Sequence, residues 1–362
     1  MRVAGTPYRT IWPAADGWAV EVIDQTRLPH QFARVRLETL DDAARAIRDM
    51  VVRGAPLIGA TAAYGMALAL RHDPTDRSLD AGARTLVATR PTAVNLGRAV
   101  RTMLEHVRPL APKTRADAAY ARAAALCEED VARNRSLGEH GLAILKGLAA
   151  RKADGAPVNV LTHCNAGWLA TVDWGTATAP VYLAHRDGIP VHVWVTETRP
   201  RNQGALTAWE LGEEGVPHTF AVDNAAGHLM RMGVVDAVIV GTDRTISSGD
   251  VCNKIGTYLV ASAARDCGVP FYAAVPGTSI DWETDDAAGI PIEERDPREV
   301  THVAGRDGAS RTVSVRVPPE GTPVANYGFD VTPARLVTGL ITERGVCAAS
   351  REGLLSLYPE RR

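Results

Sequence analysis

The chain has 362 residues, of which 46% are hydrophobic and 23% are charged, and its formal net charge is −2. This length favours two domains, and a near-neutral charge without a basic patch argues against nucleic-acid binding. Apolar runs are too short for a membrane protein, and the opening residues lack the apolar core of a signal peptide. The five scattered cysteines are typical of reduced thiols, so we expect a cytoplasmic protein.

The first 150 residues are predicted to form an N-terminal, mainly helical domain with a short strand-like start. In chain order, we expect a strand at 18–23, helices at 40–52 and 57–70, polar turns at 72–78 and 90–95, and paired helices between about 116 and 150.

Residues 151–362 are predicted to form a second domain, after a composition change at ARKADGAP (150–157). Strands are expected at 158–162, 191–196, 218–222, 237–240 and 271–275, and helices at 175–186, 206–213, 225–232 and 255–265. Strands that lack a polar face indicate an α/β fold with a parallel sheet covered on both sides. Residues 281–330 are expected to be irregular, with a final helix from about residue 332.

Polar, charged or glycine-rich segments follow each predicted strand. They are THCNAG (162–167), TETRPRNQG (196–204), DNAAG (223–227), GTDRTISSGDVCNK (241–254) and PGTS (276–279). The opposite ends carry little beyond turns. Because doubly wound sheets bind ligands at the carboxyl ends of their strands, this asymmetry predicts one site along one sheet edge.

Two strand-end residues are candidates for catalysis. Asp243 follows a fully apolar strand, so burial would raise its pKa and keep its acid form near neutrality. The alternative is a helix cap or an ion pair with Arg244, which could cancel that shift. Cys164 is either a thiolate favoured by nearby helix N-termini or a small buried hydrophobic residue. His163 is expected to be structural, and Cys252 is a weaker thiol candidate.

The same segments offer candidates for binding a phosphorylated sugar. The sequence has neither GxGxxG nor GxxxxGK[ST], which argues against an NAD-dependent oxidoreductase. GDVCNK is expected to open a helix, whose N–H groups and Lys254 would hold a phosphate. In the helical domain, Arg53 in RGAP and Arg90 in RPTAVN are either further phosphate ligands or ordinary charges, at the surface or in an interdomain salt bridge. Two neutral amides suit sugar hydroxyls or are simple turn residues: Gln203 and Asn253.

A series of motifs runs along the chain in this order: DQTRLP, RGAPLIGATAAYG, RPTAVNL, THCNAG, TETRPRNQG, GTDR, GDVCNKIGTY and ANYGFDVTPARLVTGLITERG. From about residue 11 to residue 358, the chain thereby resembles the methylthioribose-1-phosphate isomerases of methionine salvage. The wider family includes ribose-1,5-bisphosphate isomerases and regulatory subunits of the translation-initiation guanine-nucleotide exchange factor.

The resemblance implies that Cys164 and Asp243 are the catalytic pair. The residues that it implies for substrate binding are Arg53, Gly54, Ala55, Arg90, Gln203, Asn253 and Lys254. It also implies a Rossmann-like C-terminal domain and a homodimer, and we expect a reaction that needs no metal or cofactor. The chain departs from the usual family pattern at Thr242 and at 247–248, which we expect to affect substrate fit.

An isomerase of this class must open the sugar ring and then move a hydrogen from C2 to C1. We expect Asp243 to protonate the ring oxygen, and Cys164 to act either as a base through an enolate or as a stabiliser of a hydride shift. A methylthio group would need an apolar pocket, which we expect near Trp12, Leu57 or Ile58. Alternatives are the same chemistry on ribose 1,5-bisphosphate or 5-deoxyribose 1-phosphate, and a non-catalytic regulatory subunit binding sugar phosphate or nucleotide.

Overall fold

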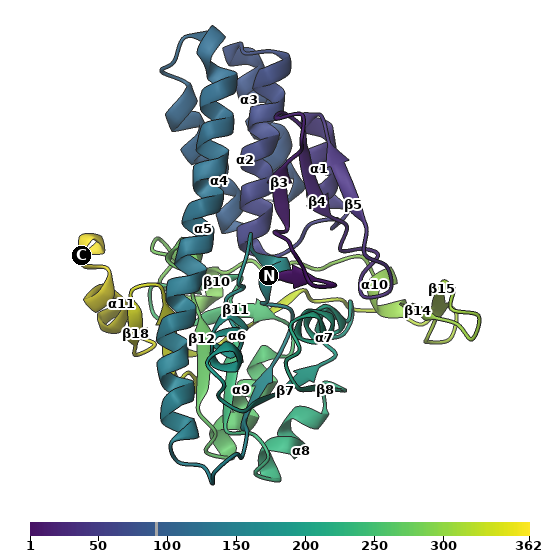
Figure 1. The fold of residues 1–362 in the computed structure, drawn as a ribbon, viewed down its shortest axis with the longest axis vertical. Coiled ribbons are helices and arrows are strands. Elements are labelled where there is room, and N and C mark those ends of the chain that lie inside the picture. The colour runs from purple at the N-terminus through teal and green to yellow at the C-terminus, as the bar shows by residue number, and fades with distance from the viewer. Residues whose placement is uncertain (91–92) are drawn as a thin grey trace.

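The computed structural model describes residues 1–90 and 93–362. A bundle of helices stands on a broader α/β body, and helix α5 (Pro112–Ala149) runs along both parts (Figure 1). The chain begins with short strands: β1 (Arg2–Val3), β2 (Thr6–Pro7), β3 (Ile11–Pro13), β4 (Val20–Ile23) and β5 (Arg34–Leu37). Strands β3, β4 and β5 form an antiparallel sheet beside the bundle.

The bundle is built around one small-residue helix. Its members besides α5 are α1 (Leu40–Arg48), α2 (Ala55–His72), α3 (Asp76–Thr89) and α4 (Val94–Val107). The helix predicted at 57–70 is confirmed as α2, which is buried on almost all sides because its residues are apolar or small all round. The turn predicted at 90–95 includes residues 91 and 92, which lie outside the described residues.

The alanine-rich stretch forms the single helix α5, so the predicted pair of helices is wrong. Proline occurs only at its first position, and its glycines serve close packing rather than a turn. A Cβ at Gly138 would lie 2.9 Å from the Cβ of Ala179, and one at Gly141 would collide with Pro180. These two glycines therefore let helix α6 (Ala179–Arg186) pack directly against α5.

A seven-stranded sheet forms the α/β body, in the order β18-β17-β12-β9-β6-β7-β8. The strands are β6 (Val158–Thr162), β7 (Val191–Thr196), β8 (His218–Ala221), β9 (Ala237–Val240), β12 (Phe271–Ala274), β17 (Gly339–Thr342) and β18 (Gly345–Cys347). Each neighbouring pair is parallel except β17 and β18. The five predicted strands are confirmed to within one residue.

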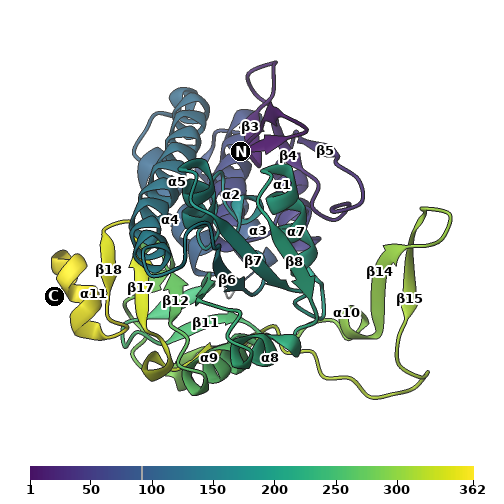
Figure 2. The ribbon, with the colours of Figure 1, turned by 60° about the horizontal axis from the view of Figure 1, so that its bottom comes forward.

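Helices cover both faces of this sheet, as predicted (Figure 2). One face packs against α5, α6 and α7 (Gln203–Glu213), and the other against α8 (Ala225–Arg231) and α9 (Thr257–Asp266). Successive side chains of β9 point to opposite faces of the sheet, so Ile239 belongs to the first core, whereas Val238 and Val240 belong to the second. Within the described ranges, no helix combines the length and hydrophobicity needed to cross a membrane.

The predicted final helix from residue 332 is wrong. Strand β16 (Phe329–Thr332) ends there, β17 and β18 follow, and the last α-helix is α11 (Arg351–Leu357). All four residues of β17 are buried, because the strand lies between β12 and β18. A short apolar run of this kind fits a buried strand as well as a helix, so periodicity could not separate them.

The GDVCNK stretch forms a strand and does not open a helix. Strand β11 (Val251–Lys254) pairs antiparallel with β10 (Arg244–Ile246) and with β16, in a small sheet that β13 (Ile280–Asp281) completes. Gly249, at φ 92°, permits the turn between β10 and β11. The prediction failed because the glycine makes a hairpin, and α9 begins only three residues after the lysine.

The segment predicted to be irregular, 281–330, contains some regular structure. A short helix α10 (Arg298–Thr301) leads into a hairpin of β14 (His302–Arg306) and β15 (Thr312–Arg316). Figure 2 shows this hairpin standing away from the body.

Candidate active site

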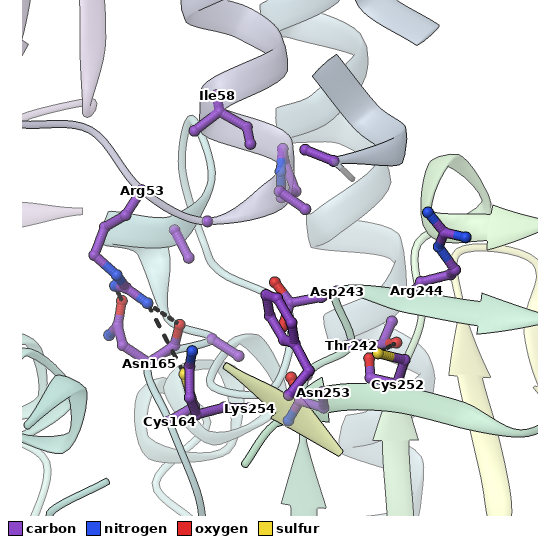
Figure 3. Close-up of a pocket in the computed structure, with 18 of the residues that line it drawn as sticks. Arg53, Ile58, Cys164, Asn165, Thr242, Asp243, Arg244, Cys252, Asn253 and Lys254 are labelled. Carbon is purple, nitrogen blue, oxygen red and sulfur yellow. Dashed lines mark hydrogen bonds between the residues drawn. The ribbon is translucent and has the colours of Figure 1, made fainter. Parts of the chain in front are cut away.

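A cavity lies at the carboxyl ends of β6 and β9, below the start of α2 (Figure 3). Its walls come from the first turn of α2, the loops after β6 and β9, and strand β11. Its lining includes both proposed catalytic residues and all seven residues proposed to hold the phosphate and the sugar hydroxyls: Cys164, Asp243, Arg53, Gly54, Ala55, Arg90, Gln203, Asn253 and Lys254. The fold thus brings together residues up to 201 positions apart, from 53 to 254, at the predicted sheet edge.

Cys164 is held in an unusual backbone conformation at the end of β6. Its φ of 71° lies in the left-handed region, which costs a non-glycine residue about 1–2 kcal/mol. The Cys164 N–H donates to Thr198 Oγ1 at 2.8 Å, and its carbonyl accepts from Thr207 Oγ1 at 3.0 Å. Such strain persists only where surrounding contacts fix it, and it is common at functional sites.

The thiol of Cys164 is buried beside two cations. Arg53 Nη2 lies 4.0 Å from its Sγ, and the same guanidinium donates to Asn165 Oδ1 at 2.5 Å and to the Asn165 carbonyl at 3.1 Å. Burial raises the pKa of the Cys164 thiol, and the positive charges of Arg53 and Lys254 oppose that rise. Two side-chain cations therefore favour a thiolate here, beside the N-terminus of α2, which also borders the cavity.

Asp243 borders the same cavity three residues after β9. Its surroundings raise the pKa of the carboxyl, chiefly by burial, while Lys254, Arg90 and Arg53 oppose the rise. Asp243 is not completely buried, and it lines the cavity, so a ligand in the cavity can contact it. Its neighbour Arg244 donates to Asp281 at 3.2 Å. A raised pKa keeps a proton on Asp243 at higher pH than on an exposed aspartate.

Three cations face the cavity: Arg53 and Lys254, which are buried, and Arg90, which is partly buried. Lys254 Nζ donates to the Gly328 carbonyl at 2.8 Å and lies 4.7 Å above the Phe329 ring. Arg90 lies 3.7 Å from Glu293. Burial lowers the pKa of Lys254, which means that its charge is poorly solvated and would gain from an anionic ligand. This local excess of positive charge fits a phosphate group.

Unpartnered polar atoms in the cavity wall also favour a polar ligand. Among the described residues that line the cavity, Arg90 Nε and Gln203 Oε1 are buried without a hydrogen-bond partner. Buried polar atoms usually have partners, so a bound molecule is a natural source for the missing ones. Asn253 Nδ2 donates to Thr257 Oγ1 at 3.1 Å, which leaves its oxygen for another donor.

The apolar part of the lining differs from the prediction. Of the three residues expected there, Ile58 lines the cavity, together with Met50, Ile290 and Phe329. Trp12 lies elsewhere, because it packs edge-on against a tyrosine of the N-terminal segment and its indole donates to a glutamate of β4. Leu57, one residue from Ile58, points into the core of the helical bundle.

Two other sequence expectations concern neighbouring side chains. His163 is buried, with its ring nitrogens 2.7 Å from Thr196 Oγ1 and 2.9 Å from the Ile255 carbonyl, which fits the predicted structural role. Cys252 lines the cavity, and burial raises its pKa to about 12, so it is a poor thiolate. Within residues 1–90 and 93–362, there is no cluster of three or more His, Cys, Asp or Glu side chains that could hold a metal ion.

Comparison with known proteins places the chain in a family. Residues 51–349 match the model of the Initiation factor 2 subunit family. The chain is also 62% identical to the methylthioribose-1-phosphate isomerase of Rhodospirillum rubrum, over 100% of this chain and 94% of the relative. The chain belongs to the methylthioribose-1-phosphate isomerases of the Initiation factor 2 subunit family.

Two solved structures share this fold along nearly the whole chain. The 5-methylthioribose 1-phosphate isomerase of Pyrococcus horikoshii is 38% identical with a TM-score of 0.84, covering 98% of this chain and 96% of its own. The translation initiation factor eIF-2B subunit delta of A. fulgidus is also 38% identical, with a TM-score of 0.80, covering 98% of this chain and 100% of its own. The fold by itself therefore does not separate a relative named as an isomerase from one named as an initiation-factor subunit.

Sequence reasoning missed several residues that shape this family member's cavity. Thr198 and Thr207 hold the backbone of Cys164, and Asn165 holds Arg53. Behind them lies Glu210, fully buried on α7. One signal was present: Gln203, Thr207 and Glu210 recur at helical spacing, so they share one face of α7. Polar residues on an inward helix face indicate a buried network.

Proposed function

We propose that the chain converts 5-methylthioribose 1-phosphate into 5-methylthioribulose 1-phosphate, an aldose–ketose isomerisation of methionine salvage. The observation that carries this proposal is one cavity that contains a buried thiol, Cys164, a carboxyl of raised pKa, Asp243, and buried cations. The printed names of the relatives support the same reaction.

The cations supply the anchor for the C1 phosphate. Arg53, Arg90 and Lys254 bind its oxygens, and the N–H groups at the start of α2 add the positive end of a helix dipole. Gln203 and Asn253 orient the sugar hydroxyls. Holding the sugar at one angle to the catalytic groups supplies several kcal/mol of the barrier. The methylthio group lies against apolar lining residues: Met50, Ile58, Ile290 and Phe329.

Ring opening is the first chemical step. The phosphate on the anomeric oxygen prevents the spontaneous opening available to a free sugar, so a proton must be delivered to the ring oxygen. Asp243 delivers it, because burial keeps the carboxyl protonated at higher pH than an exposed aspartate. The C1–ring oxygen bond breaks as this proton is transferred, and the carboxylate that remains is stabilised by Lys254, Arg90 and Arg53.

Cys164 then serves the transfer of hydrogen from C2 to C1. Ring opening leaves an oxocarbenium ion at C1. In one route the Cys164 thiolate removes the C2 proton and the Asp243 carboxylate takes the C2 hydroxyl proton, which gives an enolate, and the thiol then delivers a proton to C1. In the other route, a hydride moves directly from C2 to C1 while the C2 hydroxyl gives its proton to the Asp243 carboxylate, and Cys164 stabilises the positive charge. When the reaction runs in D2O, deuterium at C1 of the product supports the enolate route and excludes a direct hydride shift. Retention of the C2 hydrogen is the result expected for a hydride shift, and also for a thiol that returns its proton before exchange.

Substrate choice is tested by assaying three sugars side by side. We expect turnover of 5-methylthioribose 1-phosphate to exceed that of 5-deoxyribose 1-phosphate and of ribose 1,5-bisphosphate, since a 5-phosphate would meet the apolar lining. Cys164→Ala and Asp243→Asn should each lower kcat by about 100-fold or more with the fold intact. The matched thiol control is Cys252→Ala, which should stay within about threefold of the wild type, because its sulfur is held protonated at neutral pH.

The second candidate is a non-catalytic subunit that binds sugar phosphate or nucleotide. The similarity to eIF-2B subunit delta of A. fulgidus favours it. The catalytic reading is preferred because a binding module needs neither Cys164 nor Asp243. Measurable binding of all three sugars with turnover of none would establish the subunit and refute the isomerase.

We also propose two domains, at 1–150 and 151–362, in a cytoplasmic homodimer. The linker at 150–157 supports the boundary, and the separate core of the helical bundle supports two domains, although the second half of α5 packs on the sheet. The free state of all five cysteines suits a reducing compartment. Exposed apolar side chains offer surface for self-association: Phe220, Val222, Met232 and Leu259. Light scattering after size-exclusion chromatography tests the dimer.

A further inference from the structure

We propose that Glu210 is a positioning residue, which holds Asn165 and through it fixes the Arg53 guanidinium beside Cys164. The inference rests on the proposed function for the roles of Arg53 and Cys164. It concerns a buried carboxyl on α7 that lies one layer behind the cavity and does not line it.

Glu210 receives hydrogen bonds from both sides of the turn that follows β6. Asn165 Nδ2 donates to its Oε1 at 3.1 Å, and the Leu169 N–H donates to the same oxygen at 2.7 Å. Tyr182 Oη donates to Oε2 at 3.2 Å. The turn wraps closely over the carboxyl, since a Cβ at Gly167 would lie 2.5 Å from Glu210 Cδ.

Two acceptors set which way the Asn165 amide points: Glu210 Oε1 and Thr207 Oγ1, each 3.1 Å from Nδ2. Above about pH 7 the Glu210 carboxylate is ionised and only accepts hydrogen bonds, so it holds the Asn165 NH2 towards itself and the amide oxygen the other way. That oxygen accepts from Arg53 Nη1 at 2.5 Å, and the Asn165 carbonyl accepts from Nη2 at 3.1 Å. Figure 3 shows these bonds and the approach of the same guanidinium to Cys164.

The burial of this charge has a cost that a structural role does not explain. Glu210 has no exposed surface, and burial raises its pKa to about 7, with Arg53 among the groups that oppose the rise. An apolar residue would leave the Leu169 N–H and Tyr182 Oη without an acceptor, but the side-chain oxygen of a neutral glutamine could accept hydrogen bonds without burying a charge. A carboxylate at this position is explained by its need to orient the amide and to balance the buried guanidinium.

Glu210→Gln tests the proposal with almost no change of volume. The glutamine presents both an oxygen and an NH2, so the Asn165 amide keeps only Thr207 as a fixed acceptor, and its oxygen is held less firmly towards Arg53. We expect kcat/KM to fall by roughly 10- to 100-fold. The matched control is Glu214→Gln at the end of the same helix, which removes a charge that instead contacts Arg186, and it should keep wild-type activity.

A double-mutant cycle with Arg53→Met separates positioning from a merely structural role. If Glu210 acts through Arg53, Glu210→Gln should have almost no further effect on kcat/KM in the Arg53→Met background. Full and independent losses from the two substitutions would overturn the proposal.

Alkylation of Cys164 by iodoacetamide gives a readout that needs no turnover. Loss of a negative charge alone would shift the midpoint of the alkylation rate to lower pH, whereas departure of the Arg53 guanidinium would shift it to higher pH. The other charges near the thiol, Lys254 and Asp243, are the same in both proteins. We expect the higher midpoint in Glu210→Gln, with Cys164 followed by mass spectrometry, and a lower or unchanged midpoint refutes positioning. This result holds even if the wild type turns over none of the sugars, an outcome that would refute only the proposed reaction.

Discussion

The start of α2 depends on a glycine, and its replacement should damage both stability and activity. Gly54 is the N-cap of α2, between Arg53 and the first helical turn, with φ 87° and ψ 137°. This backbone conformation is almost restricted to glycine. A Cβ here would also lie 2.5 Å from Ala170 Cα and would collide with the Ala170 carbonyl. Both obstacles are backbone atoms, which cannot rotate away.

Gly54→Ala therefore carries two separate costs. The unfavourable backbone angles cost about 1–3 kcal/mol, and overpacking against Ala170 costs about 1–3 kcal/mol more. We expect the free energy of unfolding to fall by roughly 2–6 kcal/mol. Relief of the collision must move the start of α2 away from Ala170, and a displacement of about 1 Å at a positioning group can lower activity about 100-fold.

Urea denaturation and steady-state kinetics together measure these effects. The matched control is Gly147→Ala in the exposed part of α5, where an added Cβ meets no atom within 4 Å. The control should be stabilised by about 0.5–1 kcal/mol, because alanine is the better helix former, and its activity should not change. If Gly54→Ala unfolds at the wild-type urea concentration and keeps wild-type kcat/KM, the reasoning about this contact is wrong.

Two further predictions concern buried charges. Lys254→Met should raise KM for the phosphorylated sugar by about 10-fold or more, because a charge-assisted hydrogen bond contributes about 1.5–3 kcal/mol. An unchanged KM would show that Lys254 does not bind the phosphate. Asp130 is buried on α5, and burial raises its pKa from 3.8 to about 6. The folded state thus holds this proton more tightly than the unfolded state, so the wild type loses stability as pH rises from about 4 to about 6. The difference in unfolding free energy between Asp130→Asn and the wild type should therefore rise by roughly 3 kcal/mol, in favour of the variant, between pH 4 and pH 7. Urea denaturation of both proteins at the two pH values measures this difference. If the two proteins change in stability by the same amount between these pH values, the prediction is wrong.

The sequence by itself determined the secondary structure that depends on residues close together in the chain. Val158–Thr162 is rich in apolar and β-branched residues, so its identity as a strand could be predicted, and THCNAG after it marked the carboxyl end of the sheet. The α2 helix followed from its run of small apolar residues. Cys164, Gln203 and Asp243 could be predicted because parallel strands deliver their ends to one edge, whereas Gly54 and Ala55 followed from the family resemblance.

Only the tertiary structure decided how the candidate residues are held. Glu210 and Asn165 are 45 positions apart, and Arg53 is 112 positions from Asn165, so no local pattern reports their hydrogen bonds. Lys254 reaches the cavity from a strand because β11 pairs with β10 and β16, a choice made by partners elsewhere in the chain. Local periodicity records which face of an element is buried, whereas the direction of a buried polar group is set by whichever donor or acceptor the fold places opposite it.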